Sequence, residues 1–125
     1  MISTTDIHWS AGLIDGEGSF FLNTKSASPR VSAQMADEDT IRKLHRIWGG
    51  CVYFLPRRKS HWSDMWVWTL NGRRAAGVMM TLYVLMSARR KAKIESVIDI
   101  WRTFGRKFKS PGARAARPRW QDRGI

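Results

Sequence analysis

The sequence predicts an α+β domain: one antiparallel sheet with helices packed on one of its faces. Apolar residues recur at helical spacing in several segments, and two pairs of short apolar or alternating runs between them are typical of strands. Each pair is joined by turn-forming or basic residues, as in a hairpin. The resulting order is helix, two strands, helix, two strands, helix and helix. A sheet built from two such hairpins is antiparallel and leaves its second face uncovered.

The first half of the chain contains the first helix, the first hairpin and the second helix. Thr4, Thr5 and Asp6 are good N-cap residues for the first helix, and Gly16 with Gly18 is expected to end it. The expected elements are a helix over residues 7–14, strands over 19–25 and 30–35, and a helix that Asp37 or Asp39 caps and Gly49 ends.

The second half contains the second hairpin and two further helices. Trp66 and Trp68 share one face of the fourth strand with Leu70, and we expect this face to pack in the core. The pattern does not otherwise assign which side chains of the third and fourth strands point to the core and which to the free face. The expected elements are strands over residues 51–55 and 61–70, a basic hairpin tip over 56–60, a buried helix from Asn71 to Ser87, and a helix over 89–104.

Length and composition fit a single folded domain. The chain has 125 residues, of which 43% are hydrophobic, enough for one core and too few for two. We expect residues 1–105 to form this domain and residues 106–125 to form a basic C-terminal tail. The single cysteine, Cys51, excludes an internal disulfide and is expected to be a small buried side chain. Without a secretory signal or a spanning run, we expect a cytoplasmic or organellar matrix or nucleoid location and no membrane partner.

The charge of the chain points to a polyanionic partner. Lys and Arg number 22 against 10 acidic residues, giving a formal net charge of +12 and a pI near 11.1. A domain of this size with an ordinary solvated surface usually carries a net charge of about 2–8. Nucleic acid is therefore the leading candidate, and an anionic membrane surface is well behind it.

Residues 10–18 read SAGLIDGEG and combine two features at the end of the first helix. Gly12 and Gly16 are four residues apart, so they form a flat stripe along which a second helix can approach closely. Asp15 and Glu17 lie where the helix ends, and the negative end of the helix dipole disfavours each of them by about 0.3–1 kcal/mol. A divalent cation that prefers oxygen ligands, such as Mg²⁺, would compensate for this.

This nine-residue string resembles the signature of the LAGLIDADG homing endonucleases. Ser10 replaces the usual leucine, which affects an apolar contact and no chemistry. Glu17 conservatively replaces the second aspartate, and Gly16 keeps a small residue at its position. The identical positions are Ala11, Gly12, Leu13, Ile14, Asp15 and Gly18.

The resemblance implies a fold of order αββαββα and a Mg²⁺-dependent double-strand endonuclease. A chain with one motif should form a homodimer that cuts long, nearly palindromic double-stranded DNA sites, because two cuts need two carboxylate–metal centres close together. Glu17 is the expected metal-binding and catalytic acid. Asp15 is expected to be structural, with metal contact as the alternative. The expected dimer interface consists of Ala11, Gly12, Asp15 and Gly16.

Family members also carry a basic residue near the start of the last helix, close to the scissile phosphate. The matching stretch is 89–93, in which Lys91 is the first candidate and Arg90 the second. Such a run could equally be a solvated helix end. A polar residue after the second strand positions water in some relatives. Gln34 or Asp37 occupies that place here, although Asp37 could serve only as a helix cap.

The uncovered face of the sheet is the expected DNA-reading surface, because side chains alternate across a strand. Arg, Asn and Gln side chains match the base edges of the major groove. The basic hairpin tip extends this surface, and the tail adds charge. The expected DNA-binding residues are Asn23, Lys25, Arg30, Ser32, Gln34, Arg57, Arg58 and Lys59.

Three other functions are compatible with parts of the sequence. A catalytically silent DNA-binding regulator would keep the fold. Loss of the motif acid would favour this function, but the acid, Glu17, is present. An RNA maturase that assists its host intron would use the basic tail, with intron RNA as a further partner. A generic RNA- or single-strand-binding module would explain charge and aromatic content and would leave the motif unexplained.

Overall fold

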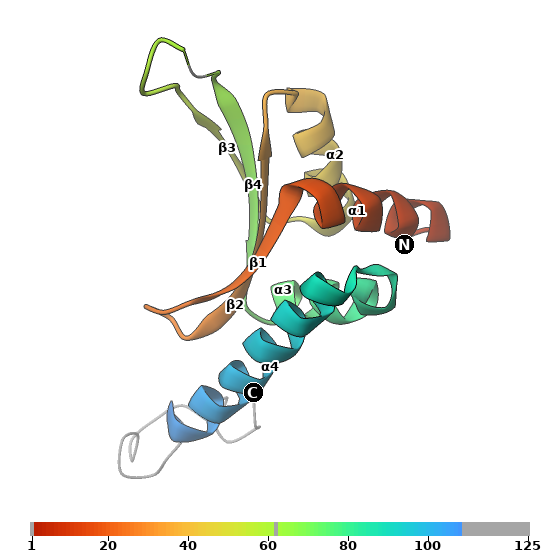
Figure 1. The fold of residues 1–125 in the computed structure, drawn as a ribbon, viewed down its shortest axis with the longest axis vertical. Coiled ribbons are helices and arrows are strands. Elements are labelled where there is room, and N and C mark those ends of the chain that lie inside the picture. Colours follow the sequence, from red (N-terminus) through yellow and green to blue (C-terminus); the bar gives the residue numbers. More distant parts are fainter. Residues whose placement is uncertain (1, 62, 109–125) are drawn as a thin grey trace.

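The structure, a computed structural model, describes residues 2–61 and 63–108 and contains one four-stranded antiparallel sheet of order β1-β2-β4-β3. All four helices pack on the same side of this sheet (Figure 1), which confirms the predicted α+β class. No helix in the described part is long and apolar enough to cross a membrane. The elements are α1 (Thr4–Glu17), β1 (Gly18–Asn23), β2 (Ser28–Met35), α2 (Glu38–Trp48), β3 (Cys51–Leu55), β4 (Met65–Asn71), α3 (Gly72–Leu82), the 3-10 turn η1 (Tyr83–Leu85) and α4 (Ala88–Phe108).

Helix α1 is longer than expected at both ends. Ser3 is its N-cap, and the Ser3 hydroxyl accepts the N–H of Asp6. Gly16 does not end the helix, because a single glycine in a helix costs only about 1 kcal/mol. The helix ends at Gly18, where an added Cβ would lie 2.7 Å from Ile14 Cγ2. The chain can therefore turn directly from α1 into β1 only with glycine at this position.

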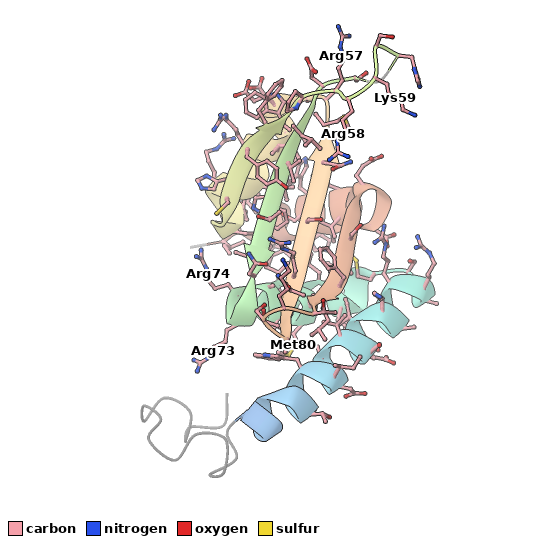
Figure 2. All side chains as sticks on the ribbon, turned by 90° about the vertical axis from the view of Figure 1, so that its left-hand side faces the viewer. Arg57, Arg58, Lys59, Arg73, Arg74 and Met80 are labelled. Atoms are coloured by element: carbon pink, nitrogen blue, oxygen red, sulfur yellow. The ribbon has the colours of Figure 1, made fainter. Side chains whose placement is uncertain are left out.

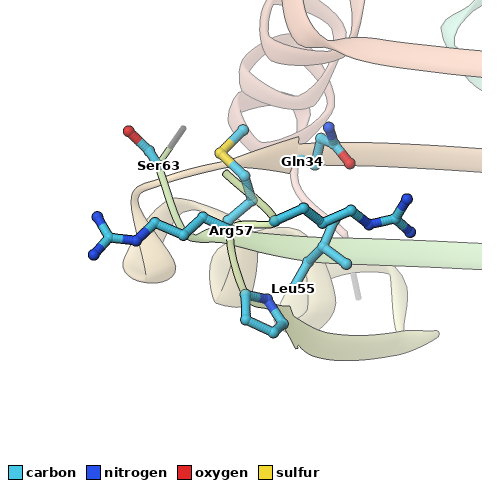
Figure 3. A pocket seen from close by; sticks show the side chains of 7 residues that line it. Gln34, Leu55, Arg57 and Ser63 are labelled. Atoms are coloured by element: carbon cyan, nitrogen blue, oxygen red, sulfur yellow. The ribbon is translucent and has the colours of Figure 1, made fainter. Parts of the chain in front are cut away.

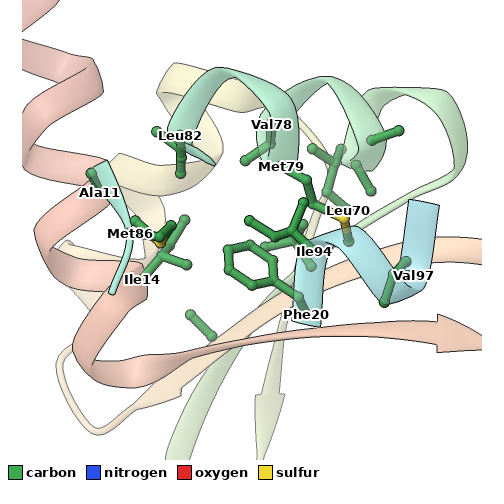
Figure 4. Packing of buried hydrophobic residues seen from close by; sticks show 14 of the residues in the cluster. Ala11, Ile14, Phe20, Leu70, Val78, Met79, Leu82, Met86, Ile94 and Val97 are labelled. Atoms are coloured by element: carbon green, nitrogen blue, oxygen red, sulfur yellow. The ribbon is translucent and has the colours of Figure 1, made fainter. Parts of the chain in front are cut away.

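The register of the sheet separates a core face from a free face. Phe20 lies opposite Val31, and Ala33 lies opposite Trp68; all of them are buried under the helices. The core continues from these residues to Ile14 and to apolar side chains of α3 and α4 (Figure 4). The alternate residues of the same strands point to the uncovered face. Trp66 and Trp68 lie on the core side, as predicted.

Both hairpins differ from expectation near their turns. Strand β1 ends at Asn23, whose side-chain oxygen accepts the N–H of Lys25. This hydrogen bond closes a turn, so Lys25 lies beyond the strand instead of on it. Strand β4 begins at Met65 rather than at residue 61, and the Asp64 carboxylate accepts the N–H of Arg57 within the preceding loop.

The helical half departs from expectation in two places. The expected helix from Asn71 to Ser87 ends at Leu82 and is followed by the 3-10 turn. Asn71 makes no side-chain cap hydrogen bond, because its oxygen accepts Arg30 Nε instead. Helix α4 continues through residue 105 to Phe108. Of the expected tail, residues 109–125 lie outside the described part of the chain.

Candidate functional site

Glu17 is the last residue of α1 and is exposed to solvent. The last turn of α1 contains no basic residue. Among the described side chains of residues 2–61 and 63–103, none forms a salt bridge with Glu17. Its carboxylate therefore lies at the unfavourable end of the helix dipole without a compensating cation among the described side chains.

Asp15 has a different environment from Glu17. It is half-buried, and its Oδ1 accepts the backbone N–H of Ser87 at 3.2 Å. Ser87 immediately precedes α4, and its carbonyl accepts the N–H of Lys91 in the first turn of that helix. A carboxylate at a helix N-terminus is favourable. Asp15 thus acts as a structural contact between the end of α1 and the start of α4.

The basic residues of α4 are divided between different faces of the helix. Arg89, Arg90 and Lys93 line a hollow of about 450 Å³ beside Ser19, two residues after Glu17. Arg90 Nε is buried there and has no hydrogen-bond partner among the described residues. These side chains, rather than Lys91, lie next to the strand that leaves the motif.

Lys91 lies on a separate face of α4. Its Nζ is 5.6 Å from the centre of the Tyr83 ring. The Tyr83 hydroxyl donates to the Glu95 carboxylate, and this hydrogen bond raises the pKa of Tyr83. Lys91 and Glu95 are one helical turn apart, so Lys91 belongs to this cluster and not to the hollow beside Ser19.

The glycine stripe of α1 is open to solvent. Gly12 and Gly16 are exposed, and a Cβ added to either would have no neighbour within 4 Å. Ala11 differs from the expected interface set, because it is only 4% exposed and packs inside the subunit. Helix phase explains this: Ala11 is about 100° away from Gly12 and points with Ile14 towards the core.

The residues fit a divalent cation only in part. Within residues 2–61 and 63–108 no group of three His, Cys, Asp or Glu side chains could hold a metal ion. Glu17 supplies one exposed carboxylate per copy. Mg²⁺ keeps several waters and commonly binds one or two carboxylates together with phosphate oxygens of a substrate. The single carboxylate is therefore compatible with Mg²⁺ that takes its remaining oxygen ligands from water and from a phosphate-bearing substrate.

The free face of the sheet carries most of the expected DNA-reading residues. Figure 2 looks onto this side of the molecule, with the basic hairpin tip at its upper end. Arg30 Nε donates to Asn71 at 2.7 Å, and its guanidinium lies 5.8 Å from the centre of the Phe21 ring. Arg30 is thus held in place from both neighbouring strands. The expected residues on this face are Asn23, Arg30, Ser32 and Gln34.

A hollow of about 530 Å³ lies where the free face meets the hairpin tip (Figure 3). Leu55 and Met65 were absent from the expected site, although Cys51, Tyr53 and Leu55 alternate along β3. The face of β3 could not be assigned from that short run alone. The residues lining the hollow are Gln34, Leu55, Pro56, Arg57, Arg58, Ser63 and Met65.

Asp37 and Cys51 lie outside the motif and have different environments. Asp37 is the N-cap of α2: its Oδ1 accepts the N–H of Asp39 at 3.2 Å and its Oδ2 accepts the Thr40 hydroxyl at 2.6 Å. Both of its oxygens are engaged in capping. Cys51 is exposed instead of buried, because it begins an edge strand and pairs with Thr69 on the free face.

Comparison with known proteins gives similarity in structure only. No protein-family model matches the chain, and no curated protein sequence matches it. The homing endonuclease I-CvuI, solved with its target in the presence of Ca, aligns with a TM-score of 0.59 and 13% identity over 84% of this chain and 71% of that one. The homing endonuclease I-TnaI aligns with a TM-score of 0.57 and 13% identity over 99% of this chain and 97% of that one.

A mutant of I-SmaMI also aligns, with a TM-score of 0.59 and 14% identity over 86% of this chain. The match covers 40% of I-SmaMI, so the chain spans less than half of that protein. The class that fold and site define is therefore an α+β domain with the homing-endonuclease fold. The resemblance to the LAGLIDADG homing endonucleases, first indicated by residues 10–18, is confirmed at the level of the fold.

Proposed function

We propose that this chain is a Mg²⁺-dependent endodeoxyribonuclease that cuts both strands of long, nearly palindromic DNA sites as a homodimer. One observation carries the proposal: Glu17 presents an exposed carboxylate, without a cationic partner among the described side chains, at the end of the helix that bears the open Gly12–Gly16 stripe. A cation and a second copy of the chain would compensate for the charge and cover the stripe. The homing-endonuclease fold supports a nuclease that acts on DNA.

In the proposed dimer the two α1 helices meet along Gly12 and Gly16. The absence of side chains there allows close backbone approach, and a two-fold axis through the contact brings both Glu17 residues to its centre. A symmetric protein then requires a symmetric DNA site. Glu17 and Asp15 differ in role: Glu17 would hold the cation, whereas Asp15 fixes α4 through Ser87.

Glu17 and DNA phosphate oxygens would hold Mg²⁺. When bound, the cation supplies charge stabilisation at the leaving oxygen and a nucleophilic water at neutral pH. The arginines beside Ser19 would supply further positive charge to the reacting phosphate. Arg90 is favoured over Lys91 for this role, because Arg90 lines the hollow beside Ser19 while Lys91 lies over Tyr83.

The free sheet face would lie in the major groove, which is wide enough for a two-stranded ribbon. Base edges would meet Asn23, Arg30, Ser32 and Gln34, and the phosphates would meet Lys25 and the hairpin tip residues Arg57, Arg58 and Lys59. The net charge of +12 supports strong, salt-dependent attraction to DNA.

The proposal is tested by incubating a randomised duplex library with the wild-type chain and Mg²⁺ and sequencing the cut ends. We expect a single nearly palindromic consensus around the cuts, and none with the Glu17→Gln variant or with EDTA. Cut ends without a consensus, or a consensus without two-fold symmetry, would contradict the proposed function.

A further inference from the structure

The free face of the sheet is divided into a polar half and an apolar half. Strands β1 and β2 present Ser, Asn, Arg and Gln side chains to it. The β3–β4 half is different: the register places Tyr53 opposite Val67 and Leu55 opposite Met65 on the same face. Tyr53 is 48% exposed. The face that we propose to contact DNA thus contains apolar side chains that neither the core nor phosphate binding explains.

At the hairpin end of the free face, apolar side chains line a pocket. Leu55 and Met65 are half-buried and line the hollow together with Gln34 (Figure 3). Arg57 and Arg58 also line it, so cationic groups suited to DNA phosphates border its apolar lining. Phe21, an aromatic residue on the β1–β2 half of this face, has the Arg30 guanidinium 5.8 Å from the centre of its ring.

We propose that Leu55 and Met65 form a subsite for the C5-methyl group of a thymine in the DNA target, with Gln34 binding the adenine of the same base pair. The proposal rests on the proposed function, because it requires the free face to enter the major groove. The thymine methyl is the one apolar group on the base edges of that groove, and Gln pairs with adenine N6 and N7 there. Charge complementarity with Arg57 and Arg58 makes duplex DNA the fitting occupant of this hollow.

The methyl group can be removed without changing the protein. Two randomised duplex pools, one synthesised with thymine and one with uracil in its place, are selected for binding to the wild-type chain without divalent cation, so that no strand is cut. We expect thymine enrichment at a pair of symmetry-related positions in the first pool. The preference at these positions falls in the uracil pool, by about fourfold per half-site for loss of one buried methyl group, and other positions keep theirs.

Two protein variants locate the effect. Leu55→Ala and Met65→Ser should weaken the thymine preference at the same pair of positions in the thymine pool. Phe54→Ala is the matched control: Phe54 neighbours Leu55 on β3, is 46% exposed, and lies on the opposite face beside Trp66. It should leave base preference unchanged. The uracil comparison requires no variant and so does not depend on how any of them fold.

The outcomes separate the two proposals. A consensus that is the same in the thymine and uracil pools would overturn the methyl subsite and leave the DNA-binding function standing. An equal change of preference in Phe54→Ala and Leu55→Ala would also overturn the subsite. A thymine pool without any enriched sequence would overturn sequence-specific DNA binding itself, and the subsite with it.

Discussion

Asp15 and Ser87 join the C-terminal end of α1 to the N-terminal end of α4, although 72 positions separate them in the chain. The Ser87 N–H donates to Asp15 Oδ1 at 3.2 Å. Glu17 lies two residues after Asp15, and Arg90 lies three residues after Ser87. Together with the packing of α4 against β1, this hydrogen bond positions the motif acid relative to the arginines beside Ser19.

Replacing Asp15 tests this link. Asp15→Ala should lower the free energy of unfolding by about 1–2 kcal/mol, as for loss of a helix cap, and Asp15→Asn, which keeps an acceptor oxygen, should lose less. Urea unfolding followed by circular dichroism measures the difference. Asp99→Ala, an exposed acid on α4, is the control and should stay within about 0.5 kcal/mol of wild type. Equal losses at positions 15 and 99 would refute the link.

Glu17→Gln should abolish double-strand cleavage while leaving DNA affinity within a few-fold, because it removes the carboxylate and keeps the shape. Cleavage is followed on a plasmid carrying a selected site, and affinity by electrophoretic mobility shift. Glu38→Gln is the matched control, since Glu38 lies on α2 and pairs there with Arg42. If the Glu17→Gln variant cuts at the wild-type rate, Glu17 is not part of the catalytic site.

Gly12→Leu should separate the subunits, because the new side chain fills the space that a second α1 would occupy. Gly77→Leu is a close control: Gly77 is also helical and exposed, and its added Cβ also meets nothing within 4 Å. Sedimentation velocity should give a monomer for the first variant and a dimer for the second. A wild-type chain that stays monomeric on cleaved DNA would contradict the dimer.

Arg90→Ala should slow cleavage by at least about 100-fold, the scale for removing one donor that stabilises developing charge. Lys91→Ala should change it by less than about threefold, because Lys91 contacts Tyr83. Single-turnover rates at saturating protein separate cleavage from binding. The reverse order of effects would restore Lys91 as the basic catalytic residue.

Cys51 offers a chemical probe of the free face. It is the single cysteine of the chain, is exposed, and shares a row of this face with Thr69 and Ser32. Bound DNA should therefore slow its reaction with a maleimide by at least about tenfold. A Cys51→Ser chain with Glu38→Cys on the helical side should react at the same rate with and without DNA. Equal protection at both positions would mean that DNA does not lie on the sheet.

The sequence predicted order and class well because period-two and period-3.6 patterns are local. Strand Cys51–Leu55 and the capping of α2 at Asp37 appear as expected. The sequence pattern could not decide whether Lys91 or Arg90 is the basic residue near the motif. A shift of one residue along a helix rotates the side chain by about 100°, so an alignment uncertain by one residue points to a different face. Leu55 was missed because the five-residue edge strand β3 shows no face of its own until β4 pairs with it. Met65 was missed because it lies opposite Leu55, and that pairing is not visible in the sequence.

The strict alternation of the sheet has an evolutionary consequence. Residues that form the core and residues of the free face, which we propose to face DNA, occupy neighbouring positions on the same strands, yet they project to opposite sides. Selection can therefore replace every second residue to follow a drifting target while the core stays unchanged. Arg30 and Asn71 are an exception, because each binds the other across two strands. Replacing either residue alone removes this hydrogen bond, so we expect the two positions to change together.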